Sequence, residues 1–259
     1  MRVAVCLSGQ PRKALETYQY IYDNIIQPNN ADVFIHMHYD NANLNIEKGH
    51  LDNGTCILTL ELDTKLIDLY NPKRYLIEPP RNFQKPNIGV AETRLQNYQK
   101  MNSHRNYSDS EMKTHMVKQL TSMYYSIYKC NELKEVYANE QGIVYDYVIR
   151  LRFDFLPREP VVCSQLDQNY IYYLELGQPD QLISDWFNIG SNTIMNVYAS
   201  LYLNMDYLNT FMFFKKNDRL ENILEPSEIY SGLNEHMLRD LMTLFCIPKR
   251  AIQLNAQLA

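Results

Sequence analysis

A group of charged residues at the end of one apolar run is the first feature of the sequence that could do chemistry. The segment Tyr145–Phe155 reads Tyr-Asp-Tyr-Val-Ile-Arg-Leu-Arg-Phe-Asp-Phe, and Pro157 closes it. Alternation along a β-strand predicts that Arg150, Arg152 and Asp154 share one face. These charges need partners, because an unpaired charge is costly to bury on a central strand. Arginine suits phosphate oxygens, and a carboxylate suits Mg²⁺ or Mn²⁺.

The pattern therefore predicts a diphosphate site at the carboxyl end of this strand, where α/β sheets bind ligands. A divalent cation on Asp154 would stabilise the charge that develops on a departing diphosphate. Arg152 stands where a two-aspartate metal motif would have its first aspartate, which weakens the case for a metal. A structural network, in which the arginines and the aspartate only satisfy one another, is the alternative.

A second candidate is the turn Ser8-Gly-Gln-Pro-Arg12, directly after the first apolar run. Gly9 permits close approach of a ligand to the backbone, and Ser8 and Gln10 offer side-chain hydrogen bonds. Arg12 can meet a phosphate. We expect this turn to hold a nucleotide, although the Gly-Lys-Ser/Thr end of a P-loop is missing. An ordinary strand-to-helix turn is the alternative.

A third candidate is the segment Asp185-Trp-Phe-Asn-Ile-Gly190. Trp186 and Phe187 offer flat apolar surfaces for the C–H faces of a sugar. Asp185 could act as a general base toward an acceptor hydroxyl, and Asn188 could bind hydroxyls of a donor. The alternative is that both aromatic residues are core and that Asp185 caps a turn.

Several further polar residues are weaker candidates. Three of them, at helical spacing, could line the donor pocket or form an ordinary helix face: Gln119, Ser122 and Ser126. His236 could be a further metal ligand, or an ordinary residue of its helix. His36 and His38 lie two apart on one predicted strand, and they could bind zinc only with ligands from elsewhere.

The elements that must position these residues alternate between strands and helices. Apolar runs closed by turn residues predict strands at 2–7, 31–36, 74–78, 145–155 and 171–174. Apolar spacing predicts helices at 15–25, from the capping box at Ser108–Glu111 to Gly142, at 192–203 and at 227–245, with a turn at 185–190. This succession predicts an α/β fold with a mostly parallel, Rossmann-like central sheet flanked by helices.

Length and composition restrict the class of protein. The 259 residues are 46% hydrophobic and 21% charged, which predicts one globular domain over 1–259 with a mobile loop at about 81–110. A net charge of −5 argues against a nucleic-acid partner. No apolar stretch approaches the roughly 20 residues of a transmembrane segment. Five scattered cysteines without a CxxC pair indicate reduced thiols and a cytoplasmic location.

Taken together, these segments resemble a family of GT-A-type glycosyltransferases found in polysaccharide and lipopolysaccharide gene clusters, including WavE-like relatives. The matching segments are 5–12, 31–36, 145–154 and 184–191, with a weaker one at 226–228. The resemblance implies a GT-A fold, a UDP- or GDP-sugar donor, and a saccharide or glycolipid acceptor. It also implies a cationic site or a Mn²⁺ or Mg²⁺ ion at Asp154.

The expected activity is transfer of a sugar from a nucleoside diphosphate-sugar to an acceptor hydroxyl. In that reaction Arg150 or Arg152 stabilises the leaving diphosphate, and Asp185 is the base if the anomeric carbon is inverted. Two alternatives stay open at this point. One is a sugar nucleotidyltransferase, and the other is a non-catalytic carbohydrate-binding or scaffolding domain with the same fold.

Overall fold

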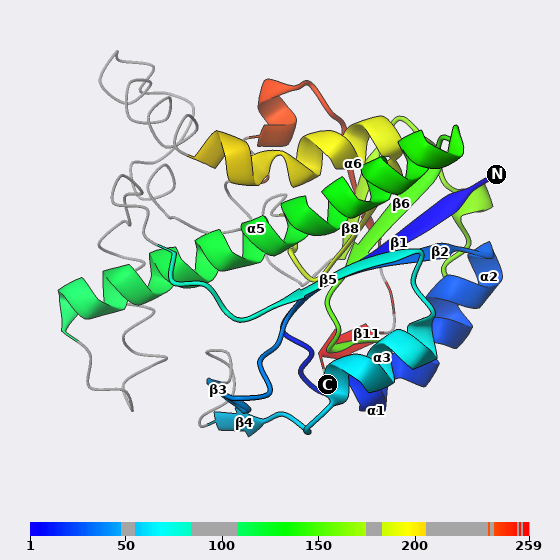
Figure 1. Ribbon diagram of the computed structural model, residues 1–259. Helices are drawn as coiled ribbons and strands as arrows, with labels where there is room; N and C mark the ends of the chain where they lie inside the picture. Colours follow the sequence, from blue (N-terminus) through cyan, green and yellow to red (C-terminus); the bar gives the residue numbers. More distant parts are fainter. Residues whose placement is uncertain are drawn as a thin grey trace, which may run out of the picture.

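The computed structural model describes most of the chain: residues 1–47, 55–83, 108–174, 183–205, 238, 241–252, 254 and 256–258. Within these residues a single large sheet lies between two layers of helices (Figure 1). The predicted loop at 81–110 lies outside the described residues from 84 to 107. Of the predicted helix at 227–245, the structure describes 238 and 241–245; 238 and 241–244 are helical, and 245 lies in a turn.

The central sheet has seven strands. Their order is β5 (Arg74–Glu78), β2 (Asp32–His38), β1 (Val3–Gly9), β6 (Tyr147–Leu151), β9 (Phe187–Ser191), β8 (Ile171–Leu174) and β10 (Lys249–Ile252). Every neighbouring pair is parallel except those that include β9, which runs antiparallel to both β6 and β8. The expectation of a mostly parallel α/β sheet is therefore confirmed.

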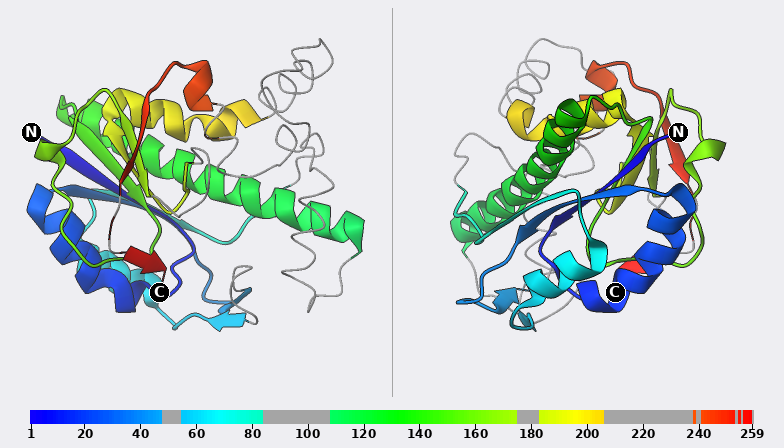
Figure 2. Two further views of the ribbon diagram at one scale, coloured as in Figure 1. Left: turned by 180° about the vertical axis from the view of Figure 1, so that it is seen from behind. Right: turned by 45° about the vertical axis from the view of Figure 1, so that its right-hand side comes forward.

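Helices cover both faces of this sheet (Figures 1 and 2). One layer contains α1 (Ala14–Ile21), its continuation through a π-helical turn (Tyr22–Ile26) into α2 (Gln27–Asn29), and α3 (Leu62–Tyr70). The other layer contains α5 (Asp109–Gln141) and α6 (Asn192–Ala199), and residues 201–205 are again helical. The smaller elements are a 3₁₀ turn (Cys163–Gln165), the hairpin of β3 (Asn45–Glu47) with β4 (Thr55–Ile57), and the pair of β7 (Phe155–Pro157) with β11 (Ala256–Leu258).

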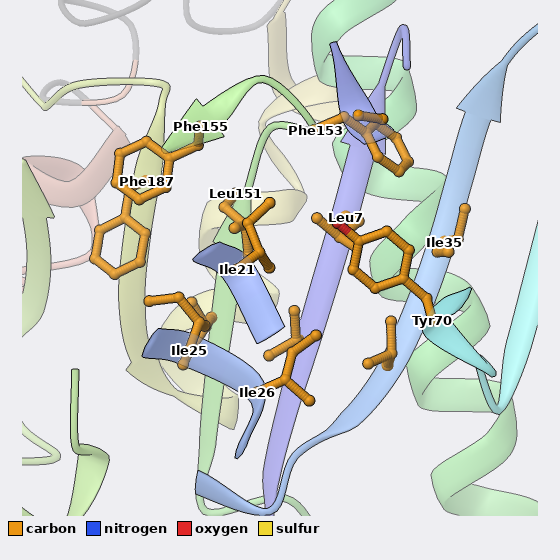
Figure 3. Close-up of a cluster of buried hydrophobic side chains, with 14 of the residues drawn as sticks. Leu7, Ile21, Ile25, Ile26, Ile35, Tyr70, Leu151, Phe153, Phe155 and Phe187 are labelled. Atoms are coloured by element: carbon orange, nitrogen blue, oxygen red, sulfur yellow. The ribbon is translucent and has the colours of Figure 1, made fainter. Parts of the chain in front are cut away.

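Two apolar clusters, one on each face, hold the layers together. Alternation along β1 sends Val5 and Leu7 toward α1 and α3, and Ala4 and Cys6 toward α5 and α6. Figure 3 shows part of the first cluster, where Leu7, Leu151 and Ile35 meet side chains from the helices. Burial of this apolar surface on both faces stabilises the strands that carry the polar residues described below.

Helix α5 begins and ends where the sequence predicts. The Ser108 hydroxyl accepts a hydrogen bond from the Glu111 amide, and the Glu111 carboxylate accepts one from the Ser108 amide at 2.8 Å. This reciprocal pair satisfies two backbone donors that the first helical turn leaves open. Gly142 ends the helix at φ 62°, a left-handed conformation that glycine adopts without strain.

The structure corrects two of the predicted elements. The strand predicted at 145–155 ends at Leu151, and Phe155 begins β7, which belongs to a separate sheet. Residues 152–154 form a turn between them, in which the Phe155 amide donates to the Arg152 carbonyl at 3.3 Å. Strand alternation therefore applies to Arg150 but not through to Asp154.

The second correction concerns the turn predicted at 185–190. Phe187–Ser191 is β9, and it lies in the middle of the sheet between β6 and β8. Its residues alternate between faces, with Phe187 and Ile189 in the α1/α3 cluster. Gly190 has no side chain because α6 packs directly over it, and a Cβ there would lie 2.8 Å from Cγ2 of Ile194. Helix α3, strand β10 and both small sheets were not predicted from the sequence.

Candidate functional site

The two faces of the sheet differ at the carboxyl ends of the parallel strands. On the α1/α3 face, apolar residues continue to the strand ends, as at Leu7, Met37 and Leu151. On the α5/α6 face, polar residues replace them, and each is at most 3% exposed: Ser8, His36, His38, Arg150 and Asn188. Carboxyl ends of parallel strands are where such sheets bind ligands. The candidate site is therefore on the α5/α6 face at this edge.

Arg150 lies at the centre of this polar row. Its Nε donates a hydrogen bond to the Ser8 hydroxyl at 3.2 Å, and its Nη1 has no hydrogen-bond partner in the part of the chain that the structure describes. No carboxylate of the described residues forms an ion pair with it, although the residue is only 2% exposed. A buried guanidinium with an open donor is expensive unless an anion completes it. This hydrogen bond brings together residues from two of the candidate segments, the turn after β1 and the end of β6.

Asn188 faces Arg150 directly across β6 and β9. Its Nδ2 donates to the Ser184 carbonyl at 2.9 Å, whereas its Oδ1 finds no partner among the described residues. The hydroxyl of Tyr198, on α6, is also buried. It lies close enough to Arg150 to interact with it, but it forms no hydrogen bond of normal geometry with a described residue. Burial raises the pKa of Tyr198 to about 12, an effect that Arg150 opposes and Asp185 reinforces. A ligand with anionic oxygens and hydroxyls would satisfy all three groups.

Arg152 and Asp154 form a bidentate ion pair beside this row. Arg152 Nε lies 2.8 Å from Asp154 Oδ1, and its Nη2 lies 2.7 Å from Oδ2. Burial acts to lower the pKa of Arg152, but Asp154 and, more weakly, Asp185 outweigh it and raise the pKa above its ordinary value. The guanidinium of Arg152 therefore stays charged.

The ion pair with Arg152 bears directly on the metal site expected at Asp154. Both Asp154 oxygens already accept from Arg152, so a cation at this carboxylate would have to displace the guanidinium or lie next to its positive charge. Among the described residues, no group of three or more histidine, cysteine, aspartate or glutamate side chains could hold a metal ion. The described residues thus do not fit a divalent-cation site. His236, the other predicted ligand, lies outside the described residues.

The turn after β1 has its own local geometry. Gly9 adopts φ 119°, which side-chain-bearing residues rarely reach, so a glycine is required for the chain to leave β1 in this direction. Gln10 Oε1 accepts a hydrogen bond from Arg12 Nε at 3.0 Å. Ser8 thus belongs to the buried row, while Gln10 and Arg12 are held to each other in the turn above it. Their predicted contact with a nucleotide stays a prediction.

The segment before β9 is divided between the site and the core. Asp185 is 5% exposed and influences the pKa of both Arg152 and Tyr198, so it lies on the polar side. Phe187 is fully buried and stacks on Phe155 with ring centroids 5.0 Å apart (Figure 3). The predicted sugar surface is therefore wrong for Phe187. Trp186 is partly buried and packs against the same cluster, and its carbonyl accepts from the Arg152 amide at 3.2 Å.

At its β2 end, the polar row continues to Glu78 on β5 through His36. His36 Nδ1 lies 2.6 Å from the Ser126 hydroxyl of α5, and its Nε2 lies 3.2 Å from Glu78 Oε1. Burial, with a further contribution from His38, lowers the pKa of His36 to about 4. Because both of its nitrogens are engaged, His36 is not arranged as a zinc ligand. Of the predicted polar residues on α5, Ser126 contacts His36 directly, and Gln119 is partly exposed two turns earlier.

Two candidate residues of the site, Tyr198 and Glu78, were not predicted from the sequence. Tyr198 sits in the apolar stripe of α6 and has the pattern of a core residue. Glu78 ends a predicted strand, and only the parallel pairing of β2 with β5 brings it to His36. The available signal was that Glu78 and His36 both lie near the carboxyl ends of predicted strands.

Comparison with protein-family models and with curated protein sequences found no match. Among solved structures, core-mannan synthase A (CmsA/Ktr4) from Aspergillus fumigatus, in a Mn/GDP form, aligns with 99% of this chain and 74% of its own, at a TM-score of 0.51 and 10% identity. The chain has a GT-A-like fold. This identity is low enough that the likeness shows the fold alone.

A second solved structure, the apo-form glycosyltransferase GlyE of Streptococcus pneumoniae TIGR4, aligns with 97% of this chain and 45% of its own. Its TM-score is 0.37 at 8% identity, too low to support an argument. Within the described residues of the GT-A-like chain, no helix combines the length and the apolar character needed to cross a bilayer.

Proposed function

We propose that this protein transfers a sugar from a nucleoside diphosphate-sugar, a UDP- or GDP-sugar, to a hydroxyl of a saccharide or glycolipid acceptor. The observation that supports this most strongly is Arg150, a buried guanidinium with an open Nη1 at the carboxyl edge of a GT-A-like sheet. The diphosphate of a nucleotide-sugar would supply the anion that this open N–H group needs. Membership of the family with WavE-like relatives stays a prediction from the four matching segments.

In the proposed reaction the bond between the anomeric carbon and the diphosphate oxygen breaks, and a bond to the acceptor oxygen forms. Arg150 stabilises the negative charge that develops on the leaving diphosphate, in a site from which water is largely excluded. The open Oδ1 of Asn188 accepts a hydrogen bond from a donor hydroxyl. If the anomeric carbon is inverted, Asp185 accepts the proton of the acceptor hydroxyl.

Calorimetric titration of the full chain with UDP, GDP and their sugar conjugates tests this proposal. Binding is expected for at least one of them, with affinity lowered by about 100-fold in Arg150→Met, because a charge-assisted contact is removed. Arg74→Met is the matched control, since Arg74 forms an exposed ion pair with Glu140 away from the site. Wild-type affinity in Arg150→Met would overturn the proposed role of Arg150.

The same preparation separates the alternatives. Release of pyrophosphate from a nucleoside triphosphate and a sugar phosphate would indicate a nucleotidyltransferase. Binding of glycans without binding of UDP or GDP would indicate a carbohydrate-binding domain.

A cytoplasmic location stays a prediction. Three of the described cysteines are buried and form no disulfide: Cys6, Cys130 and Cys163.

A further inference from the structure

Arg152 is paired with Asp154, the residue at which a cation was predicted from the sequence. The Arg152 side chain is 25% exposed and that of Asp154 is 8% exposed, so the arginine is the more accessible member of the pair. The guanidinium has five N–H donors. Asp154 receives two of them in parallel, through Nε and Nη2, which leaves Nη1 and the second Nη2 hydrogen to point away from the carboxylate.

Three features hold Arg152 in this orientation. Its backbone amide donates to the Trp186 carbonyl and so continues the β6–β9 ladder by one residue. A bidentate arginine–carboxylate pair fixes the plane of the guanidinium as well as its position. Asp185 acts on the pKa of both Arg152 and Tyr198, and Tyr198 is in turn affected by Arg150. Leu151 and Phe153, which flank Arg152 in the chain, both lie in the α1/α3 cluster, which indicates that Arg152 leaves the chain on the same, polar side as Arg150.

We propose that Arg152, oriented by Asp154, takes the place of a divalent cation and contacts the diphosphate directly, so that nucleotide binding needs no added metal. This inference rests on the proposed function and assigns Asp154 as a positioning residue. A cation on Asp154 would have to displace Arg152 or lie within a few ångströms of its positive charge, where the two like charges repel each other. The diphosphate instead receives charge from Arg150 and Arg152.

The test compares UDP and GDP binding to the full chain in EDTA and in Mn²⁺ by calorimetry. Wild-type dissociation constants are expected to agree within about threefold between the two conditions. Arg152→Ala should weaken binding by about 30-fold in both conditions, because a bidentate or charge-assisted contact is lost. Arg152→Lys should restore only part of it, since an ammonium lacks the planar fork.

Asp154→Asn tests the positioning role separately. It removes the charge that orients Arg152 but keeps one oxygen acceptor, so binding should fall by about tenfold in EDTA and should not become dependent on Mn²⁺. Arg74→Ala serves as the control and should bind as wild type does. Thermal unfolding of each variant shows whether it folds. If Arg152→Ala does not fold, the conclusion depends on the two conservative variants, Arg152→Lys and Asp154→Asn.

Two outcomes would overturn the inference while the proposed function stands. One is an increase in wild-type affinity of about tenfold or more with Mn²⁺ that Asp154→Asn abolishes, since this is the behaviour of a metal ligand. The other is unchanged nucleotide affinity in a folded Arg152→Ala. If the wild-type chain binds neither nucleotide in either condition, the proposed function fails and this inference fails with it.

Discussion

Arg150 and Asn188 face each other across strands β6 and β9, and each has a buried polar atom without a hydrogen-bond partner among the described residues. One open atom is a cationic donor and the other an amide acceptor, so a ligand with both anionic oxygens and hydroxyls would complete the two. Buried polar groups are nearly always satisfied in folded proteins. This pair is therefore the part of the fold where stability and ligand binding are expected to oppose each other.

The first prediction concerns the stability of Arg150→Met without ligand. The change removes a buried charge that forms no ion pair among the described residues and replaces it with an apolar chain of similar length. We expect the free energy of unfolding in urea to stay the same or rise by about 1 kcal/mol. Arg150→Lys, which keeps the charge, should show no gain. A loss of more than about 2 kcal/mol in Arg150→Met would show that the charge is satisfied in the folded protein.

The second prediction concerns Asn188→Asp, which places a carboxylate directly opposite Arg150. The new charge should satisfy the guanidinium, so the unliganded protein keeps or gains stability at pH 7. It should also compete with an anionic ligand and weaken nucleotide binding by about tenfold or more. Asn139→Asp, at an exposed position near the end of α5, adds the same charge away from the site. Tighter nucleotide binding in Asn188→Asp would contradict the assignment of this row as a phosphate site.

The third prediction is a loss of stability in acid that depends on His36. The pKa of His36 is about 4 in the folded protein, below the ordinary 6.5 of an unfolded histidine. Between these values the unfolded chain binds more protons, so the free energy of unfolding should fall as pH is lowered from about 6.5 to about 4, by at most about 3 kcal/mol. Urea denaturation at several pH values measures this slope.

The groups that face His36 shape this effect. Burial is its largest cause, His38 and Lys129 add to it, and Glu78 opposes it by favouring the charged form. His36→Gln keeps hydrogen bonding to Ser126 and Glu78 possible and removes the titration. The slope should become shallower in this variant, and an identical slope in both proteins would assign the acid sensitivity to other groups.

The fourth prediction tests the packing of α6 on β9. In Gly190→Ala the new Cβ would lie 2.8 Å from Cγ2 of Ile194, so α6 has to shift, at a cost of about 1–3 kcal/mol. Because α6 carries Tyr198, which lies at the candidate site, the proposed sugar transfer should slow as well. Adding Ile194→Ala relieves the contact and should recover part of the stability lost, measured as a coupling energy between the two positions. If the effects of the two substitutions on the free energy of unfolding simply add, this contact does not limit the packing of α6 on β9.

Much of the α/β architecture could be predicted because its signals are local. The capping box at Ser108 and Glu111 and the glycine at 142 marked both ends of α5 within the sequence itself. The apolar runs of β1, β2, β5 and β8 had the short length and turn boundaries typical of strands in a parallel sheet. The strand β9 was missed because its five residues include a glycine and follow several turn-forming residues, so no local period separates it from a turn.

The candidate site was predicted in its parts and not in its arrangement. The sequence by itself determined which residue types end the strands, and hence that Ser8 and Arg150 would meet at one edge, since parallel strands place their carboxyl ends together. Only the tertiary structure decided that the chain turns at Arg152, which pairs this arginine with Asp154 instead of leaving the carboxylate for a metal. It also decided that Asn188 faces Arg150, because strand register and direction depend on contacts between segments far apart in the chain, and no local pattern encodes them.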